Sequence, residues 1–226
     1  WHNYRRCPAA SLAQRMVASV GLLTQRPGWR QEYRKAIRLA REHASPDVEL
    51  DVAASFGFAL KLSGRLQEAL DVYREAGERA HERRLTAWEH RLREGLMSIH
   101  WHAGDLRAAL EVGEELAAEV GPQRQPDFYL AQVLADLGRH EESVDHARRM
   151  VDRSMPTWQS LGEALWALSD AELAAGNARG SLEAADTLLE RFGNCGPTAF
   201  VQLTRSWAMH DLGLQLDRTS LDAGQP

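Results

Sequence analysis

Four stretches of eight residues resemble one another closely enough to decide the fold. They read SGRLQEAL at 63–70, AGDLRAAL at 103–110, LGRHEESV at 137–144 and AGNARGSL at 175–182. In each stretch a glycine stands second, a small residue follows five positions after it, and an apolar residue comes next. The glycines are 40, 34 and 38 residues apart, a spacing that is typical of a repeated structural unit.

Each of these glycines is expected to lie in a turn between two helices, because glycine readily adopts the left-handed conformation that ends a helix. The small residue would let the next helix pass close to the previous one; these residues are Ala69, Ala109, Ser143 and Ser181. Apolar residues recur at helical spacing after the turn, as in Leu66, Leu70 and Tyr73. Weaker copies at Gly28 and Gly213 extend the series. The sequence therefore predicts an all-α fold of about five antiparallel helix pairs, with the last pair incomplete.

Breaks that contain proline separate the predicted pairs. They are Ser45-Pro46-Asp47, Gly121-Pro122 and Met155-Pro156-Thr157, and Thr157 is expected to cap a helix that runs to Ala175. Residues 1–213 are predicted to form one helical repeat array, and residues 214–226, which lose the periodicity, a frayed C-terminal tail. Because the chain opens at Trp1 and not at methionine, we expect it to be a fragment of a longer protein.

Composition excludes several classes of partner. Hydrophobic residues make up 44% and charged residues 26%, as in soluble folded proteins. The net charge of −5 gives no attraction to nucleic acid. The longest apolar run, Met16 to Leu23, is too short to span a membrane. Cys7 and Cys195 offer no disulfide framework, so we expect a reducing, cytoplasmic compartment.

No motif in the sequence predicts catalysis. The run Gly176-Asn177-Ala178-Arg179-Gly180-Ser181 lacks the lysine and the preceding strand of a phosphate-binding loop, and no Gly-x-Ser-x-Gly elbow occurs. The nine histidines include no pair four residues apart on one helix, which a helical metal site would need. We therefore expect a protein that is not an enzyme and holds no metal or cofactor.

One repeat resembles the tetratricopeptide signature. Ala53, Phe56, Gly57 and Leu60 come before the turn at Gly64, and Ala69 and Tyr73 follow it, with small and aromatic residues where that family has them. The other repeats depart from the signature: Met97, Ala131 and Ser169 stand at the position of Gly57, and Gly113, Ala147 and Ala185 at the position of Tyr73. The resemblance implies a right-handed α-solenoid whose first helices line a concave groove. The repeats of up to 40 residues also resemble the arrays in LuxR-like and maltose-activator-like bacterial transcriptional regulators.

The resemblance also implies which residues face the groove, because in this family they lie at fixed distances before the turn glycine. These positions include a set of aromatic and polar residues: Phe58, Lys61, Arg91, Glu94, Trp101, Phe128, Gln132, Trp166, Asp170 and Trp207. Aromatic anchors with a few polar groups are typical of a groove that binds a peptide or helix. Alternatively, several of the aromatics pack between neighbouring pairs, since a register error of one residue rotates a side chain by about 100°.

The sequence therefore predicts a non-catalytic interaction module that binds a peptide or protein segment in its groove. The alternative is a ligand-sensing domain of a multidomain bacterial transcriptional regulator. Clamping of a C-terminal carboxylate, known from chaperone adaptors of this family, is argued against, because Lys61 alone cannot build a clamp of lysine and paired asparagines. Terminal helices with exposed apolar faces could also pair with a second copy of the chain.

Overall fold

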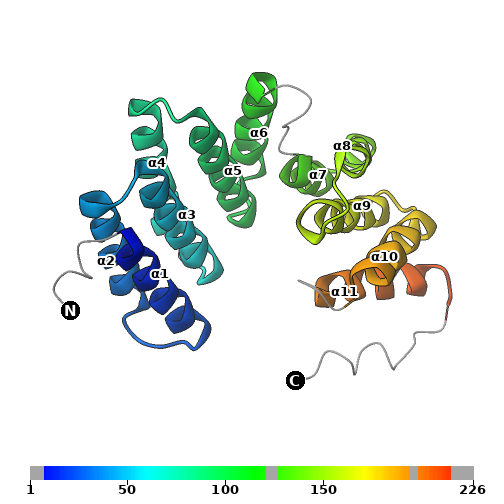
Figure 1. The fold of residues 1–226 in the computed structure, drawn as a ribbon. Coiled ribbons are helices and arrows are strands. Elements are labelled where there is room, and N and C mark those ends of the chain that lie inside the picture. The colour runs from blue at the N-terminus through cyan, green and yellow to red at the C-terminus, as the bar shows by residue number, and fades with distance from the viewer. Residues whose placement is uncertain (1–7, 121–126, 194–197, 215–226) are drawn as a thin grey trace. The chain divides into compact units, whose positions relative to one another are not determined.

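The computed structural model describes residues 8–120, 127–193 and 198–214, and within these ranges it contains helices and no strand (Figure 1). The predicted break at Gly121-Pro122, both cysteines and the predicted tail beyond Leu214 lie outside them. The helices are α1 (Pro8–Leu23), α2 (Trp29–His43), α3 (Pro46–Leu62), α4 (Leu66–Glu82), α5 (Thr86–His102), α6 (Leu106–Val120), α7 (Asp127–Asp136), α8 (His140–Arg153), α9 (Glu163–Ala174), α10 (Ala178–Phe192) and α11 (Thr198–Asp211).

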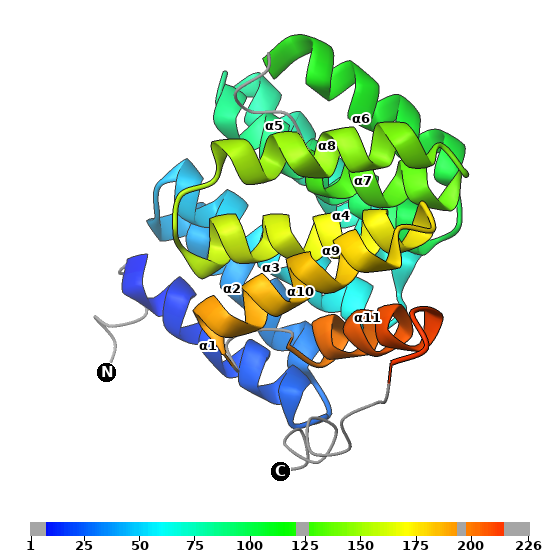
Figure 2. The same cartoon turned by 90° about the vertical axis from the view of Figure 1, so that its right-hand side faces the viewer.

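The chain divides into two units, residues 1–116 and 117–226, which we describe separately. The described helices follow one another as antiparallel pairs, and α11 comes after the fifth pair, which confirms the predicted fold class. In Figure 2 the pair α7 and α8 lies above the pair α9 and α10, and α11 follows below them. The odd-numbered helices of one unit also touch each other: α1 touches α3, α3 touches α5, α7 touches α9, and α9 touches α11.

The turn glycines have the predicted left-handed conformation. Their φ angles lie between 68° and 90° at all six positions of the repeat series: Gly28, Gly64, Gly104, Gly138, Gly176 and Gly213. At Gly64, the amide of Arg65 donates to the carbonyl of Leu60, and the glycine amide donates to the carbonyl of Lys61, both at 2.9 Å. This pair of bonds satisfies helix-end carbonyls and recurs at Gly104, Gly138, Gly176 and Gly213.

The small residues after the turns are fully buried. Ala69, Ala109, Ser143 and Ser181 have no exposed surface. The Ser143 hydroxyl donates to the carbonyl of Ala131 at 2.7 Å, and the Ser169 hydroxyl donates to the carbonyl of Ser181 at 3.0 Å. Backbones can approach this closely only where the side chains are small, which explains the small residue in each repeat.

Tyr73 of α4 fills a space between two other helices of the first unit. Its hydroxyl donates to the carbonyl of Ala54 at 3.1 Å, and its ring lies against Gly57 of α3 on one side and Gly95 of α5 on the other. A Cβ atom added at either glycine would clash with the ring. The repeat pattern in the sequence identifies Gly57 but not Gly95. Gly95 lies in the following helix pair, and it makes room for Tyr73, the aromatic residue of the preceding pair.

Two helix beginnings can be compared with the prediction. Pro46 begins α3 directly after Ser45, as the break predicts. The helix predicted from Thr157 instead opens with a π-helical turn over Trp158–Gly162 and continues as α9, which ends at Ala174. At this start the backbone carbonyl of Thr157 accepts the amides of Leu161 at 2.8 Å and Gly162 at 3.3 Å. The wider π-turn replaces the expected single α-helix start.

Replacing a turn glycine should destabilise the fold through backbone strain alone. At Gly104, where φ is 77°, an added Cβ would meet no atom within 4 Å, so Gly104→Ala should lower the free energy of unfolding by about 1–2 kcal/mol. The matched control is Gly77→Ala inside α4, where a Cβ also has open space and alanine should add about 0.5–1 kcal/mol. Denaturant unfolding measures both, and changes of the same sign would contradict the turn assignment.

Gly95→Ala should destabilise the chain by steric conflict with the Tyr73 ring, at a cost of about 1–3 kcal/mol. The cost should shrink when Tyr73 is replaced by leucine, because the clashing ring is then absent. Thermal or denaturant unfolding of the two single variants and the double variant gives the coupling free energy between positions 73 and 95. A cost of Gly95→Ala that is equal in both backgrounds would show that the ring does not set this contact.

Candidate functional site

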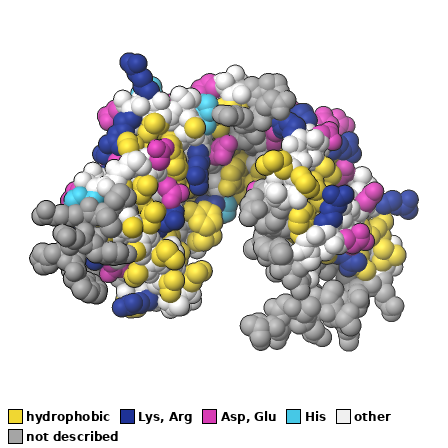
Figure 3. Space-filling view, viewed as in Figure 1, with side chains coloured by type: hydrophobic (Ala, Val, Ile, Leu, Met, Phe, Trp, Pro, Cys, Tyr) yellow, Lys and Arg dark blue, Asp and Glu magenta, His cyan; other side chains and the backbone are white. Residues whose placement is uncertain are grey.

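The predicted site residues lie on the odd-numbered helices, on the side that we call the odd-helix face of each unit. In the first unit this face comprises Phe58, Lys61, Arg91, Glu94 and Trp101; in the second it comprises Phe128, Gln132, Trp166, Asp170 and Trp207. Figure 3 shows hydrophobic side chains interspersed with charged ones on the surface of each unit.

Lys61 lies in the last turn of α3, on the odd-helix face of the first unit. Its ammonium donates to the Ser98 hydroxyl of α5 at 2.8 Å and lies 4.9 Å from the centre of the Phe58 ring. Among the described residues no carboxylate forms an ion pair with it. Burial lowers the pKa of Lys61 to about 8, since a desolvated ammonium without a counter-charge is unfavourable.

His102 lies between Trp101 and the surroundings of Lys61 in the network of contacts on α5. The Trp101 ring meets the His102 ring edge to face, with centroids 4.8 Å apart, and His102 Nδ1 lies 2.7 Å from the Ser98 carbonyl oxygen. Burial, with a smaller contribution from Lys61, lowers the pKa of His102, although its bond to Ser98 opposes this. Ser98 thus contacts both Lys61 and His102, Trp101 adjoins His102, and the Phe58 ring beside Lys61 is 49% exposed.

Arg91 and Glu94 lie on α5 N-terminal to Ser98. The Arg91 guanidinium lies 4.9 Å from the Trp88 ring centre and 4.0 Å from an oxygen of Asp51. Asp51 also pairs with Arg15 of α1. Burial raises the pKa of Glu94, and the nearby charge of Arg91 offsets this only in part. Glu94 is thus a second desolvated ionisable group on the face.

Four of the five predicted residues of the second unit form one connected group. The Phe128 ring of α7 meets the Trp166 ring of α9 at 5.4 Å and 62°. Gln132 Nε2 donates to Asp170 Oδ2 at 3.3 Å, and Trp166 also donates to Asp170. The contact of Phe128 with Trp166 matches the packing alternative for these two rings. Trp207 on α11 is 57% exposed.

Thr204 is a member of this group that the sequence reasoning missed. Its hydroxyl donates to Asp170 Oδ1 at 2.7 Å and links α11 to α9. The family's spacing, counted back from Gly213, selects Trp207 but skips Thr204. Its polar side chain one turn before Trp207, on a helix expected to face the groove, was the available signal.

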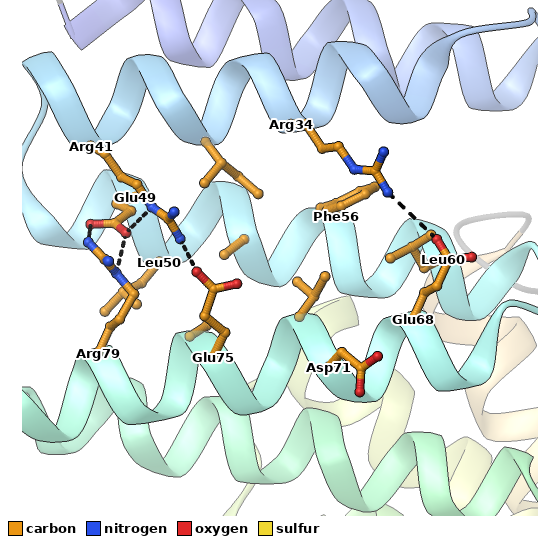
Figure 4. Close-up of a pocket in the computed structure, with 14 residues that line it drawn as sticks. Arg34, Arg41, Glu49, Leu50, Phe56, Leu60, Glu68, Asp71, Glu75 and Arg79 are labelled. Carbon is orange, nitrogen blue, oxygen red and sulfur yellow. Dashed lines mark hydrogen bonds and ion pairs between the residues drawn. The ribbon is translucent and has the colours of Figure 1, made fainter.

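A groove elsewhere in the first unit competes with the odd-helix face as a site. A cavity of about 360 Å³ lies between α2 and α4, with Leu50, Phe56 and Leu60 of α3 among the residues that line it (Figure 4). Its charged groups pair with each other, as Arg41 does with Glu49 at 2.9 Å and with Glu75 at 2.5 Å.

Glu49 shows why this groove is structural. Arg79 donates to Glu49 at 3.0 Å and Arg83 at 3.1 Å, in addition to Arg41. Burial alone would raise the pKa of Glu49, but hydrogen bonds from Arg79 and Arg41 outweigh burial and hold it below its ordinary value. The buried charge is thus satisfied within the chain, and these bonds tie α2 and α4 to α3.

The described ranges hold neither a cluster of metal ligands nor a helix suited to crossing a membrane. No three histidine, cysteine, aspartate or glutamate side chains gather there as ligands for a metal ion. No described helix combines the length and the apolar character that crossing a membrane requires.

Comparisons with known proteins bear on the fold. No protein-family model matches the chain, and no curated protein matches it. Solved structures do match the chain in fold. A tetratricopeptide repeat protein from Parabacteroides merdae is 15% identical, with a TM-score of 0.55 over 91% of this chain and 74% of that one. The tetratricopeptide-like repeats of a putative kinesin light chain from Podosopora anserina are 15% identical, with a TM-score of 0.58 over 79% and 92%.

The fold is tetratricopeptide-like. At this identity the likeness extends to the fold and not to a ligand or pathway. The tetratricopeptide resemblance stated from Gly57, Gly64 and Tyr73 is thereby confirmed at the level of fold. The narrower resemblance to bacterial transcriptional regulators stays a prediction.

Lys61 generates a prediction about stability and pH. Folding lowers its pKa from 10.5 to about 8, so between these values the unfolded chain holds this proton more tightly. Lys61→Met should therefore raise the unfolding free energy at neutral pH, by at most about 1 kcal/mol because water still screens the partly exposed amine. This advantage should shrink as the pH rises from about 8 to 10.5.

The matched control for this prediction is the exposed lysine of α2, in the variant Lys35→Met. Its unfolding free energy relative to the unsubstituted chain should show no gain at neutral pH. Denaturant unfolding at several pH values measures both variants. A destabilised Lys61→Met variant, or an advantage independent of pH, would contradict the account of a desolvated amine.

Proposed function

We propose that this chain is a non-catalytic interaction module that binds a peptide or protein segment on the odd-helix faces of its units. The observation that carries the proposal is the set of desolvated ionisable groups on these faces. Burial shifts the pKa of Lys61 downward and the pKa of Glu94 and Asp170 upward. Such groups cost stability in the free protein, and they are concentrated where proteins meet ligands.

Exposed aromatic side chains support the same surface. Phe58 and Trp207 are 49% and 57% exposed, although each is large enough to stabilise a core. Aromatic side chains are the residues that most often supply binding energy at protein interfaces. Each lies on the same face as a desolvated charge, which gives a binding segment both an apolar anchor and a polar partner.

The tetratricopeptide-like fold is consistent with this function, because such proteins are generally scaffolds without catalytic activity. The alternative of a ligand-sensing domain in a bacterial regulator would favour a closed aromatic pocket, whereas Phe58 and Trp207 are half-exposed. A cytoplasmic location stays a prediction. Pairing of terminal helices also stays a prediction, for which the exposed Met16, Val20 and Leu23 of α1 supply an apolar surface.

Removing one exposed aromatic from each unit tests the proposal. Segments are selected from a random peptide display library against the full chain, and their affinities are measured by fluorescence anisotropy. The double variant Phe58→Ala with Trp207→Ala should lose at least about tenfold in affinity, as expected for anchor residues. Its unfolding midpoint should change little, because both side chains are about half exposed.

Met155→Ala is the control, since Met155 is 67% exposed in the segment between α8 and α9. It should bind the selected segments as the unsubstituted chain does. Failure to select any segment would contradict the proposed function. Equal binding by the double variant and the unsubstituted chain would contradict its placement on the odd-helix faces.

A further inference from the structure

One side of α9 combines two carboxylates with a tryptophan. Glu163, Trp166 and Asp170 are spaced by three and four residues, so they follow one another along the same side of the helix. Burial raises the pKa of Asp170 above its ordinary value, although hydrogen bonds from Thr204, Gln132 and Trp166 oppose this. Burial raises the pKa of Glu163 as well.

Neutral donors hold the Asp170 carboxylate in place. Thr204 Oγ1 donates to Oδ1 at 2.7 Å and Gln132 Nε2 donates to Oδ2 at 3.3 Å, from α11 and α7 respectively. These bonds orient the group but do not neutralise its charge. Side chains of α7, α9 and α11 thus position the Asp170 carboxylate beside Trp166. The Phe128 ring of α7 packs against the Trp166 ring.

Within the described residues, no basic side chain pairs with Asp170 or Glu163. Three arginines of the second unit pair with other carboxylates, each buried or half-buried. Arg148 pairs with Glu172, Arg153 with Asp127, and Arg205 with Asp186. Arg205 is the informative case, because it lies on α11 next to Thr204 and still points to α10. Glu49, Asp127 and Glu172, the almost wholly buried carboxylates of the described residues, each pair with an arginine, whereas Asp170 and Glu163 do not.

We propose that the group formed by Glu163, Trp166, Asp170 and Thr204 binds a basic side chain, arginine or lysine, of the partner segment. This inference rests on the proposed function and specifies the chemistry of the partner. A cation seated here gains the charge of Asp170 and the electron-rich faces of the aromatic rings. Trp207, one turn along α11 from Thr204, offers exposed apolar surface for the stem of the same side chain.

The acidic character of the group selects among partners. An acidic segment or a nucleic acid would bring negative charge against two carboxylates that are already desolvated, which is unfavourable. A purely apolar segment would bury Asp170 further without pairing it. A basic segment is the one that compensates the desolvated charge of Asp170, because its cation supplies the opposite charge.

Selection from a random peptide display library, followed by affinity measurement with synthetic peptides, tests this inference on the full chain. Segments that bind the unsubstituted chain should be enriched in arginine and lysine relative to the library. Asp170→Asn should weaken their binding by about tenfold or more, and so should replacing the basic residue of the peptide by norleucine. Adding salt should weaken binding to the unsubstituted chain more than binding to Asp170→Asn.

The control variant is Glu183→Gln, which removes a carboxylate from the exposed side of α10 and should leave affinity unchanged. Asp170→Asn removes a desolvated charge but also replaces one of the two acceptor oxygens by an amide donor, so its unfolding midpoint is measured in parallel. A midpoint well above the temperature of the binding assay then shows that a loss of binding does not come from unfolding.

The outcomes separate this inference from the proposed function. Segments that bind the odd-helix faces without enrichment in basic residues, or that bind Asp170→Asn unchanged, would overturn the basic-partner assignment and leave the interaction module standing. A library that yields no binder at all would overturn both.

Discussion

The left-handed glycine that ends each first helix is the constraint on which the rest of the structure depends. Gly64, Gly104, Gly138 and Gly176 close one helix and direct the chain into the next with the same pair of backbone bonds. Because the turn is the same each time, residues at equal distances before it lie on the same side of successive first helices. The buried small residue after the turn then fixes how closely the pair packs. The odd-helix faces follow from this repetition, whatever side chains occupy them.

The distribution of charge distinguishes the odd-helix faces from the rest of the surface. Between α2 and α4, Glu49 lies almost wholly buried, yet Arg41, Arg79 and Arg83 pair with it, so its charge is compensated within the chain. Lys61 and Asp170 are held instead by neutral donors and acceptors, without a counter-charge among the described residues. A buried charge that is paired within the chain costs less than one left without a counter-charge, and a partner can supply the missing charge. Lys61 in the first unit and Asp170 in the second would favour partner groups of opposite sign.

Much of the fold was predictable from the sequence because it depends on local rules. The conformational freedom of Gly64 and the small size of Ala69 act within one helix pair, and both are visible as spacing. The contact of Tyr73 with Gly95 was not predictable, because it joins two neighbouring helix pairs and depends on how they pack. The π-turn after Thr157 and the bond from Thr204 to Asp170 likewise depend on how helices pack. For the site, the sequence indicated which residues share a face, but only the packing showed that Phe128 and Trp166 contact each other and that Lys61 has no ionic partner in the described chain.

The central claim is that partners bind where the desolvated charges lie, and chemical-shift mapping by NMR tests it most directly. Backbone amide and tryptophan indole signals of the labelled full chain would be followed while a selected segment is added. The account predicts that the largest changes occur on the odd-numbered helices, at Phe58, Lys61 and Trp101 or at Trp166, Asp170 and Trp207. Changes confined to the groove between α2 and α4, or to the exposed sides of α8 and α10, would contradict it.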